Sequence, residues 1–91
     1  MKVLIPNKLN NKRYSIVLNK MKKLGPPIVE AFEISNGLYF ALEGSHRISA
    51  AKELGIKPIL NTITKVDNIA EFGYVYELIR QRERKGLMIE F

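Results

Sequence analysis

Residues 42–59, with the sequence LEGSHRISAAKELGIKPI, constrain the fold more than any other part of the chain. They have the pattern of a strand end, a tight glycine turn, a helix and a new strand. Gly44 can adopt backbone conformations that a side chain disfavours, and the hydroxyl of Ser45 can cap the helix. Gly55 suits the left-handed position just after the helix, and Pro58 prevents the helix from resuming.

The start of this helix predicts an anion-binding site. Gly44, Ser45, His46 and Arg47 would bring backbone N–H groups, a hydroxyl, an imidazole and a guanidinium to one point, and helix N-termini favour phosphate. Arg47 is the strongest candidate because its planar fork can take two phosphate oxygens; pairing with a nearby glutamate is the alternative. Capping alone would account for Ser45. His46 fits equally well as a phosphate or acid–base group and as a histidine bonded to the backbone.

Length and composition limit the classes of protein that fit. The chain of 91 residues, 46% hydrophobic and 26% charged, suits one globular domain. It has neither an apolar run long enough to span a membrane nor a signal-peptide core, so we expect a cytoplasmic protein. With no cysteine and one histidine, disulfides, thiolate chemistry and zinc sites built from several such ligands are excluded.

The charge is strongly basic, with 15 lysines and arginines against 9 acidic residues and a net charge of +6. This balance suits an anionic partner such as a nucleotide or a nucleic acid, although solubility alone would also account for it. The default interpretation of the arginines near the C-terminus is a solvated helix end that complements its own dipole. The candidates for nucleic-acid contact are Lys20, Lys22, Lys23, Arg80, Arg82 and Arg84.

Periodicity predicts the other elements of a single α+β domain, in which a small mixed sheet is packed by about three helices. The tail could be a final strand, a docking segment or a partner contact, and the tail or the last helix could form a homodimer. The expected strands are 2–5, 28–34, 38–42 and 58–63, and the expected helices are 13–24, 45–54 and 65–85. A capping box at Thr64 would open the last helix. The core of the domain would span 3–64, and the tail 86–91.

Two carboxylates join His46 as candidates for catalysis. Glu30 shares an alternating face with apolar residues of its strand, which predicts an inward carboxylate; a register shifted by one residue would place it in solvent. Glu43 precedes the glycine turn and could bind a metal or accept a proton, or be an ordinary solvated strand end. The carboxylates form no cluster with a convincing metal geometry, so no metal ligands are predicted.

Residues 44–51, GSHRISAA, resemble the box of the ParB N-terminal domain and sulfiredoxin fold. ParB-like proteins carry Gly-Glu-Arg-Arg at this place, sulfiredoxins carry Gly-Cys-His-Arg, and archaeal free-serine kinases have a comparable glycine-histidine-arginine turn. The upstream order is also similar: a helix ending in Leu24 and Gly25, a proline-isoleucine-valine strand, and a hairpin at Gly37. The resemblance covers roughly residues 3–64.

The resemblance implies that Gly44, Ser45, His46 and Arg47 line a nucleotide phosphate site. The nucleotide is CTP in ParB, ATP in sulfiredoxin, and ADP or ATP in the kinases, where a carboxylate near the strand of Glu30 works as base. Ser45 stands where sulfiredoxins have cysteine, so sulfinic acid reduction is ruled out. We also expect no helix-turn-helix domain of the kind that follows in partition ParB proteins.

We therefore expect a nucleotide- or phosphate-binding domain. If it is an enzyme, the expected class is nucleotide hydrolysis or phosphoryl transfer, in which the protein positions phosphates and Mg²⁺. One alternative is a non-catalytic basic DNA- or RNA-binding module of the partition or regulatory type, which would use the basic residues of the first and last helices. Another is an adaptor whose tail docks on itself or on a partner.

Overall fold

The computed structural model describes residues 1–65, 77 and 79–91. It confirms the α+β class, with a five-stranded mixed sheet and helices packed against it. None of the described helices has the length and apolar character that a membrane span needs. Residues 79–84 are helical; the other elements are β1 (Lys2–Leu4), α1 (Asn11–Leu24), β2 (Ile28–Ser35), β3 (Leu38–Ala41), α2 (Ser45–Glu53), β4 (Ile59–Lys65) and β5 (Met88–Glu90).

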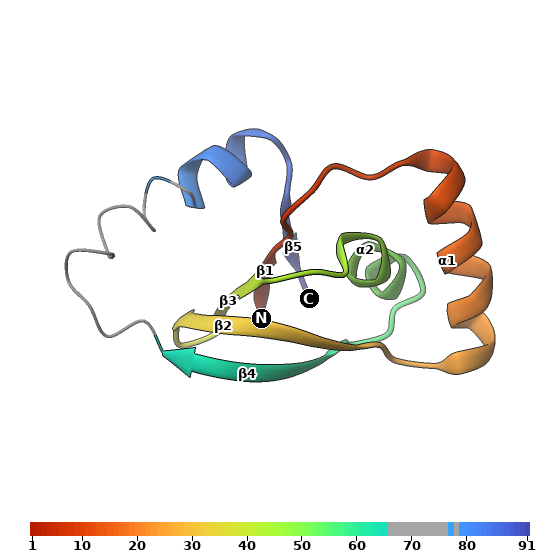
Figure 1. Cartoon of the computed structure of the whole chain (residues 1–91), viewed down its shortest axis with the longest axis horizontal. Helices are drawn as coiled ribbons and strands as arrows, with labels where there is room; N and C mark the ends of the chain where they lie inside the picture. Colours follow the sequence, from red (N-terminus) through yellow and green to blue (C-terminus); the bar gives the residue numbers. More distant parts are fainter. Residues whose placement is uncertain (66–76, 78) are drawn as a thin grey trace.

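The strands lie in the order β4-β2-β3-β1-β5, with the β2–β3 hairpin in the middle of the sheet (Figure 1). β2 pairs with β3 in antiparallel orientation, whereas β1 pairs with β3 and β2 with β4 in parallel orientation. β5 completes the sheet by antiparallel pairing with β1, which brings Ile89 opposite Val3. Of the roles considered for the tail, the structure therefore shows the final strand.

Helix α2 lies between the sheet and α1, and its two sides belong to different parts of the core (Figure 1). On the sheet side, Ile48 is fully buried in a cluster with Val29 and Ala41. On the other side, Ala50 and Ala51 pack against residues of α1. The small alanine side chains allow the two helices to approach closely, so the position of α2 is determined from both sides.

Helix α1 begins two residues earlier than predicted. Asn10 is its N-cap, with the side-chain oxygen accepting the backbone N–H of Arg13 at 3.1 Å, and asparagine is among the best capping residues. The helix ends, as predicted, at Gly25, whose φ of 78° is left-handed. Leu24 does not belong to the apolar face, because it is 80% exposed.

Of the two orientations considered for Glu30, the structure shows the one in solvent, and the inward orientation is wrong. In β2 the buried residues are Val29 and Ala31, whereas Glu30 is exposed. Ile28, on the same alternating face as Glu30, is 64% exposed. The physical reason is that Ile48 of α2 packs against the face that carries Val29, so the phase of the strand is set by the helix that covers it.

The predicted helix start at Thr64 is also wrong, because β4 continues to Lys65. β4 pairs in parallel with β2 along its length, and this pairing competes successfully with the local capping pattern. The part of the predicted helix at residues 66–76 and 78 lies outside the described residues. The C-terminal part of that helix is confirmed by the helical residues 79–84.

Candidate functional site

The first turn of α2 is reached through Gly44, which is the N-cap residue with a left-handed φ of 82°. Its carbonyl accepts the N–H of Ile48 at 2.8 Å, but no side chain of the described residues caps this turn. A Cβ on Gly44 would lie 3.3 Å from Arg47 Nη2 and 3.4 Å from the methyl groups of Val29. The left-handed conformation therefore favours glycine here, whereas a Cβ would be tight only against the flexible end of the Arg47 side chain. The first N–H groups of the helix keep their capacity to bind an anion.

Ser45 does not cap the helix, contrary to the prediction. It is the first helical residue, is 4% exposed, and its Oγ accepts the backbone N–H of Asn7 at 3.0 Å. Because Gly44 occupies the capping position, the Ser45 hydroxyl is directed to the loop between β1 and α1 instead. Ser45 therefore attaches this loop to the start of α2.

His46 makes a second attachment to the same loop. Its Nε2 accepts the backbone N–H of Asn10 at 2.9 Å. Of the roles considered for His46, the structure therefore shows a histidine bonded to the backbone. A ring nitrogen that accepts a hydrogen bond carries no proton, so this contact requires a neutral imidazole with its proton on Nδ1.

Arg47 lies half-buried beside the turn, where two long contacts hold its guanidinium. Nη2 is 3.5 Å from Oε1 of Glu43, and Nη1 donates to the carbonyl of Ile28 at 3.4 Å. Both distances are at the upper limit of hydrogen bonding, and the side chain is 40% exposed. The predicted pairing with a glutamate is present but weak, and the guanidinium remains accessible to a ligand.

These residues line a polar cavity of about 580 Å³, a volume within the usual range of ligand sites. Sequence reasoning missed two of its cationic side chains, Lys8 and Arg13, which come from the loop and the first turn of α1. The only signal for them in the sequence was the excess of lysines and arginines over acidic residues. Among the residues that the structure describes, these two and Arg47 bring three cations to the cavity against one carboxylate, Glu43, so the cavity attracts anions.

A second, apolar cavity of about 240 Å³ adjoins the first. Val17 and Arg47 line both cavities. The walls of the second cavity come from the second half of α1, the loop that follows it and one residue of α2: Val17, Lys20, Met21, Leu24, Gly25, Pro26, Pro27 and Arg47. The start of α2 thus has a cationic compartment on one side and a mainly aliphatic one on the other.

The structure does not bring all three catalytic candidates together. His46 and Glu43 line the polar cavity, whereas Glu30 does not. Glu30 is an exposed residue of β2. Within residues 1–65, 77 and 79–91, no group of three or more histidine, aspartate or glutamate side chains could hold a metal ion.

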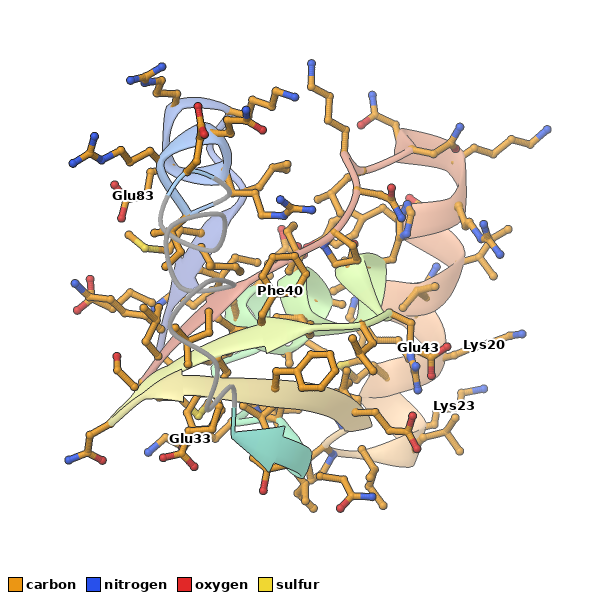
Figure 2. The ribbon with its side chains drawn as sticks, turned by 60° about the vertical axis from the view of Figure 1, so that its left-hand side comes forward. Lys20, Lys23, Glu33, Phe40, Glu43 and Glu83 are labelled. Carbon is orange, nitrogen blue, oxygen red and sulfur yellow. The ribbon has the colours of Figure 1, made fainter. Side chains whose placement is uncertain are left out.

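The basic residues considered for nucleic-acid contact lie in two separate places. Lys20, Lys22 and Lys23 belong to α1, whereas the arginines lie in the helical residues 79–84 toward the other end of the molecule (Figure 1). Figure 2 shows Lys20 and Lys23 at one end and Glu83 at the other. Arg82 is half-buried, with its guanidinium carbon 4.4 Å from the centre of the Phe40 ring. Arg82 therefore stacks on the sheet, while Arg80 and Arg84 are exposed.

Tyr14 joins the first turn of α1 to α2. Its hydroxyl lies 3.2 Å from Oε2 of Glu53 and 3.4 Å from the carbonyl of Ser49. Burial raises the pKa of Tyr14 above the ordinary 10.0, and the hydrogen bond and negative charge of Glu53 raise it further. The hydroxyl is therefore a donor at neutral pH.

Replacing Tyr14 by phenylalanine is expected to lower the free energy of unfolding by about 0.5–1.5 kcal/mol at neutral pH. Because the pKa of Tyr14 is raised in the folded state, its contribution is fully present below pH 10.0 and is lost as the pH rises above it. Urea unfolding of both proteins across this range should show the difference shrinking in alkali. A difference that stays constant well above pH 10.0 would contradict the role of the Glu53 contact.

A comparison with protein family models, with curated proteins and with solved structures finds no match for this chain.

Proposed function

We propose that this protein binds a nucleotide, with the phosphates at the start of α2 and the base in the adjoining apolar cavity. The observation that carries this proposal is that a cationic and an apolar cavity meet at Arg47 and Val17. A ligand that fills both must combine an anionic group with a compact apolar one. The resemblance of residues 44–51 to the ParB and sulfiredoxin box supports a nucleotide as that ligand.

The phosphates would be held by three kinds of donor. The uncapped N–H groups that follow Gly44 provide backbone donors at the positive end of the helix dipole. Arg47 can contribute two parallel N–H donors. Lys8 and Arg13 add positive charge from the other wall of the cavity, which suits a ligand with more than one phosphate.

The base would occupy the space between the end of α1 and the Gly25-Pro26-Pro27 loop. Val17, Met21 and the prolines can cover the faces of a planar ring and exclude water from them. The ammonium group of Lys20 is a donor for oxygen or nitrogen acceptors at the edge of the base. This compartment is what would distinguish a nucleotide from inorganic phosphate.

Calorimetric titration with ATP, ADP and CTP, each with and without Mg²⁺, tests the proposal. Inorganic tripolyphosphate is the matched ligand without a base. We expect the preferred nucleotide to bind at least about tenfold more tightly than tripolyphosphate, which corresponds to about 1.4 kcal/mol. Equal affinity for the two would contradict the base cavity, and the absence of binding by all of them would contradict the proposal as a whole. Phosphate release assayed in the same mixtures shows whether bound nucleotide is hydrolysed.

A further inference from the structure

One residue, Asn10, connects α2 to the first turn of α1 through its backbone N–H, its carbonyl and its side-chain oxygen. Its side-chain oxygen accepts the N–H of Arg13 at 3.1 Å, and its carbonyl accepts the N–H of Tyr14 at 2.8 Å. Its own N–H is donated to Nε2 of His46 at 2.9 Å. The start of α1 is therefore positioned by a side chain of α2, 36 residues away in the sequence.

We propose that His46 is a positioning residue that holds the first turn of α1, and with it Arg13, against the start of α2, and that it does so only as a neutral imidazole. Arg13 lines the polar cavity together with His46. The inference deepens the proposed function. It rests on the proposed function only for the statement that this cavity binds a ligand. The contact between His46 and Asn10 involves only residues of this chain.

The restriction to the neutral form follows from the chemistry of the ring. Protonation turns Nε2 into a donor that faces the donor N–H of Asn10, so the contact is lost. The charged side chains that line the same cavity are three cations from the loop, α1 and α2, namely Lys8, Arg13 and Arg47, and the carboxylate of Glu43. Acidification thus breaks the attachment of Asn10, the cap residue of α1, to α2, at the place where cationic groups must be held for a phosphate ligand.

Two other contacts limit how far the segment moves on release. Oγ of Ser45 still accepts the N–H of Asn7, and the Tyr14 hydroxyl still contacts Glu53. Neither depends on the protonation of His46. The change is therefore confined to the turn between these contacts, around Asn10 and Arg13.

Nitrogen-15 NMR of the ligand-free protein tests this inference. At about pH 8 we expect the Nε2 signal of His46 to be that of an unprotonated ring nitrogen and the Nδ1 signal that of a protonated one. On acidification to about pH 5, the amide signals of Asn10, Arg13 and Tyr14 should shift together with the imidazole. The amide of Gly25, at the far end of α1, is the internal control and should not follow.

Two substitutions separate positioning from a general effect of the side chain. In His46→Gln the amide oxygen can accept the Asn10 N–H but does not titrate, so the wild-type amide positions should persist at both pH values. In His46→Ala the Asn10 amide should exchange its hydrogen about 3- to 10-fold faster than in wild type, and glutamine should restore the slow rate.

The inference is overturned if the proton lies on Nε2 at the higher pH, if the three amides do not follow the imidazole, or if glutamine behaves like alanine. These readouts need no ligand. A protein that binds no nucleotide but shows the expected NMR behaviour would refute the proposed function and leave the role of His46 intact. The opposite combination would refute the role of His46 alone.

Discussion

Replacing Arg47 by alanine is expected to weaken nucleotide binding about 10- to 100-fold, because hydrogen bonds to a charged group contribute about 1.5–3 kcal/mol. Arg47 lies where the polar and apolar cavities meet, so its loss affects the part of the ligand that joins phosphate to base. Its contacts within the protein are 3.4 and 3.5 Å long. We therefore expect little change in the melting temperature of the ligand-free protein.

Calorimetry with the nucleotide that wild type binds most tightly gives the measurement. Arg47→Lys keeps the charge but not the planar fork, so it should recover only part of the affinity. Arg84→Ala is the matched control, since it removes one positive charge from an exposed position in another part of the molecule. If Arg84→Ala weakens binding as much as Arg47→Ala, net charge and not the site accounts for the affinity.

Replacing Ile48 by alanine should lower the free energy of unfolding by about 2–5 kcal/mol, the range for truncating a large buried aliphatic side chain. Ile48 is 0% exposed and packs with Val3, Val29 and Ala41 in the core between α2 and the sheet. The substitution would leave a cavity directly beneath the first turn of α2. It should therefore impair both stability and ligand binding.

Urea unfolding of the two proteins measures the effect. Ile16→Ala is the matched control, because it makes the same change on α1 at a residue that is 52% exposed and should alter stability by no more than about 0.5 kcal/mol. A loss below about 1 kcal/mol for Ile48→Ala would mean that α2 is not anchored through this residue.

The features that could be predicted from the sequence depend on local chemistry. Helix α2 ends at Glu53, and Gly55 follows its C-cap, Leu54, with a left-handed φ of 69°. The N–H of Ile56 reaches the carbonyl of Ala51 at 2.8 Å and that of Gly55 reaches Lys52 at 3.1 Å, an arrangement that favours a left-handed glycine. The turn at Gly37 likewise needs its positive φ of 82°. Each of these signals lies within a few residues of the structure that it predicts.

The errors arose where distant parts of the chain decide the outcome. Gly44 and Ser45 are both acceptable capping residues, and the choice between them is decided by the arrival of Asn7 above α2. Both alternating faces of β2 carry apolar residues, so a period of two could not show whether Glu30 or Val29 lies under α2. Arg13 enters the site through the same long-range packing, for which its neighbours in the sequence give no sign.

The strand order has a consequence for the synthesis of this protein. β1 lies between β3 and β5, so residue 3 is paired with residue 89. A chain still emerging from the ribosome has β1 and β3 but not β5, and one edge of β1 then exposes unpaired backbone groups. Exposed edges of this kind promote pairing between nascent chains. A pause in translation before residues 88–90 have emerged should therefore favour aggregation. This effect depends on no residue of the candidate site.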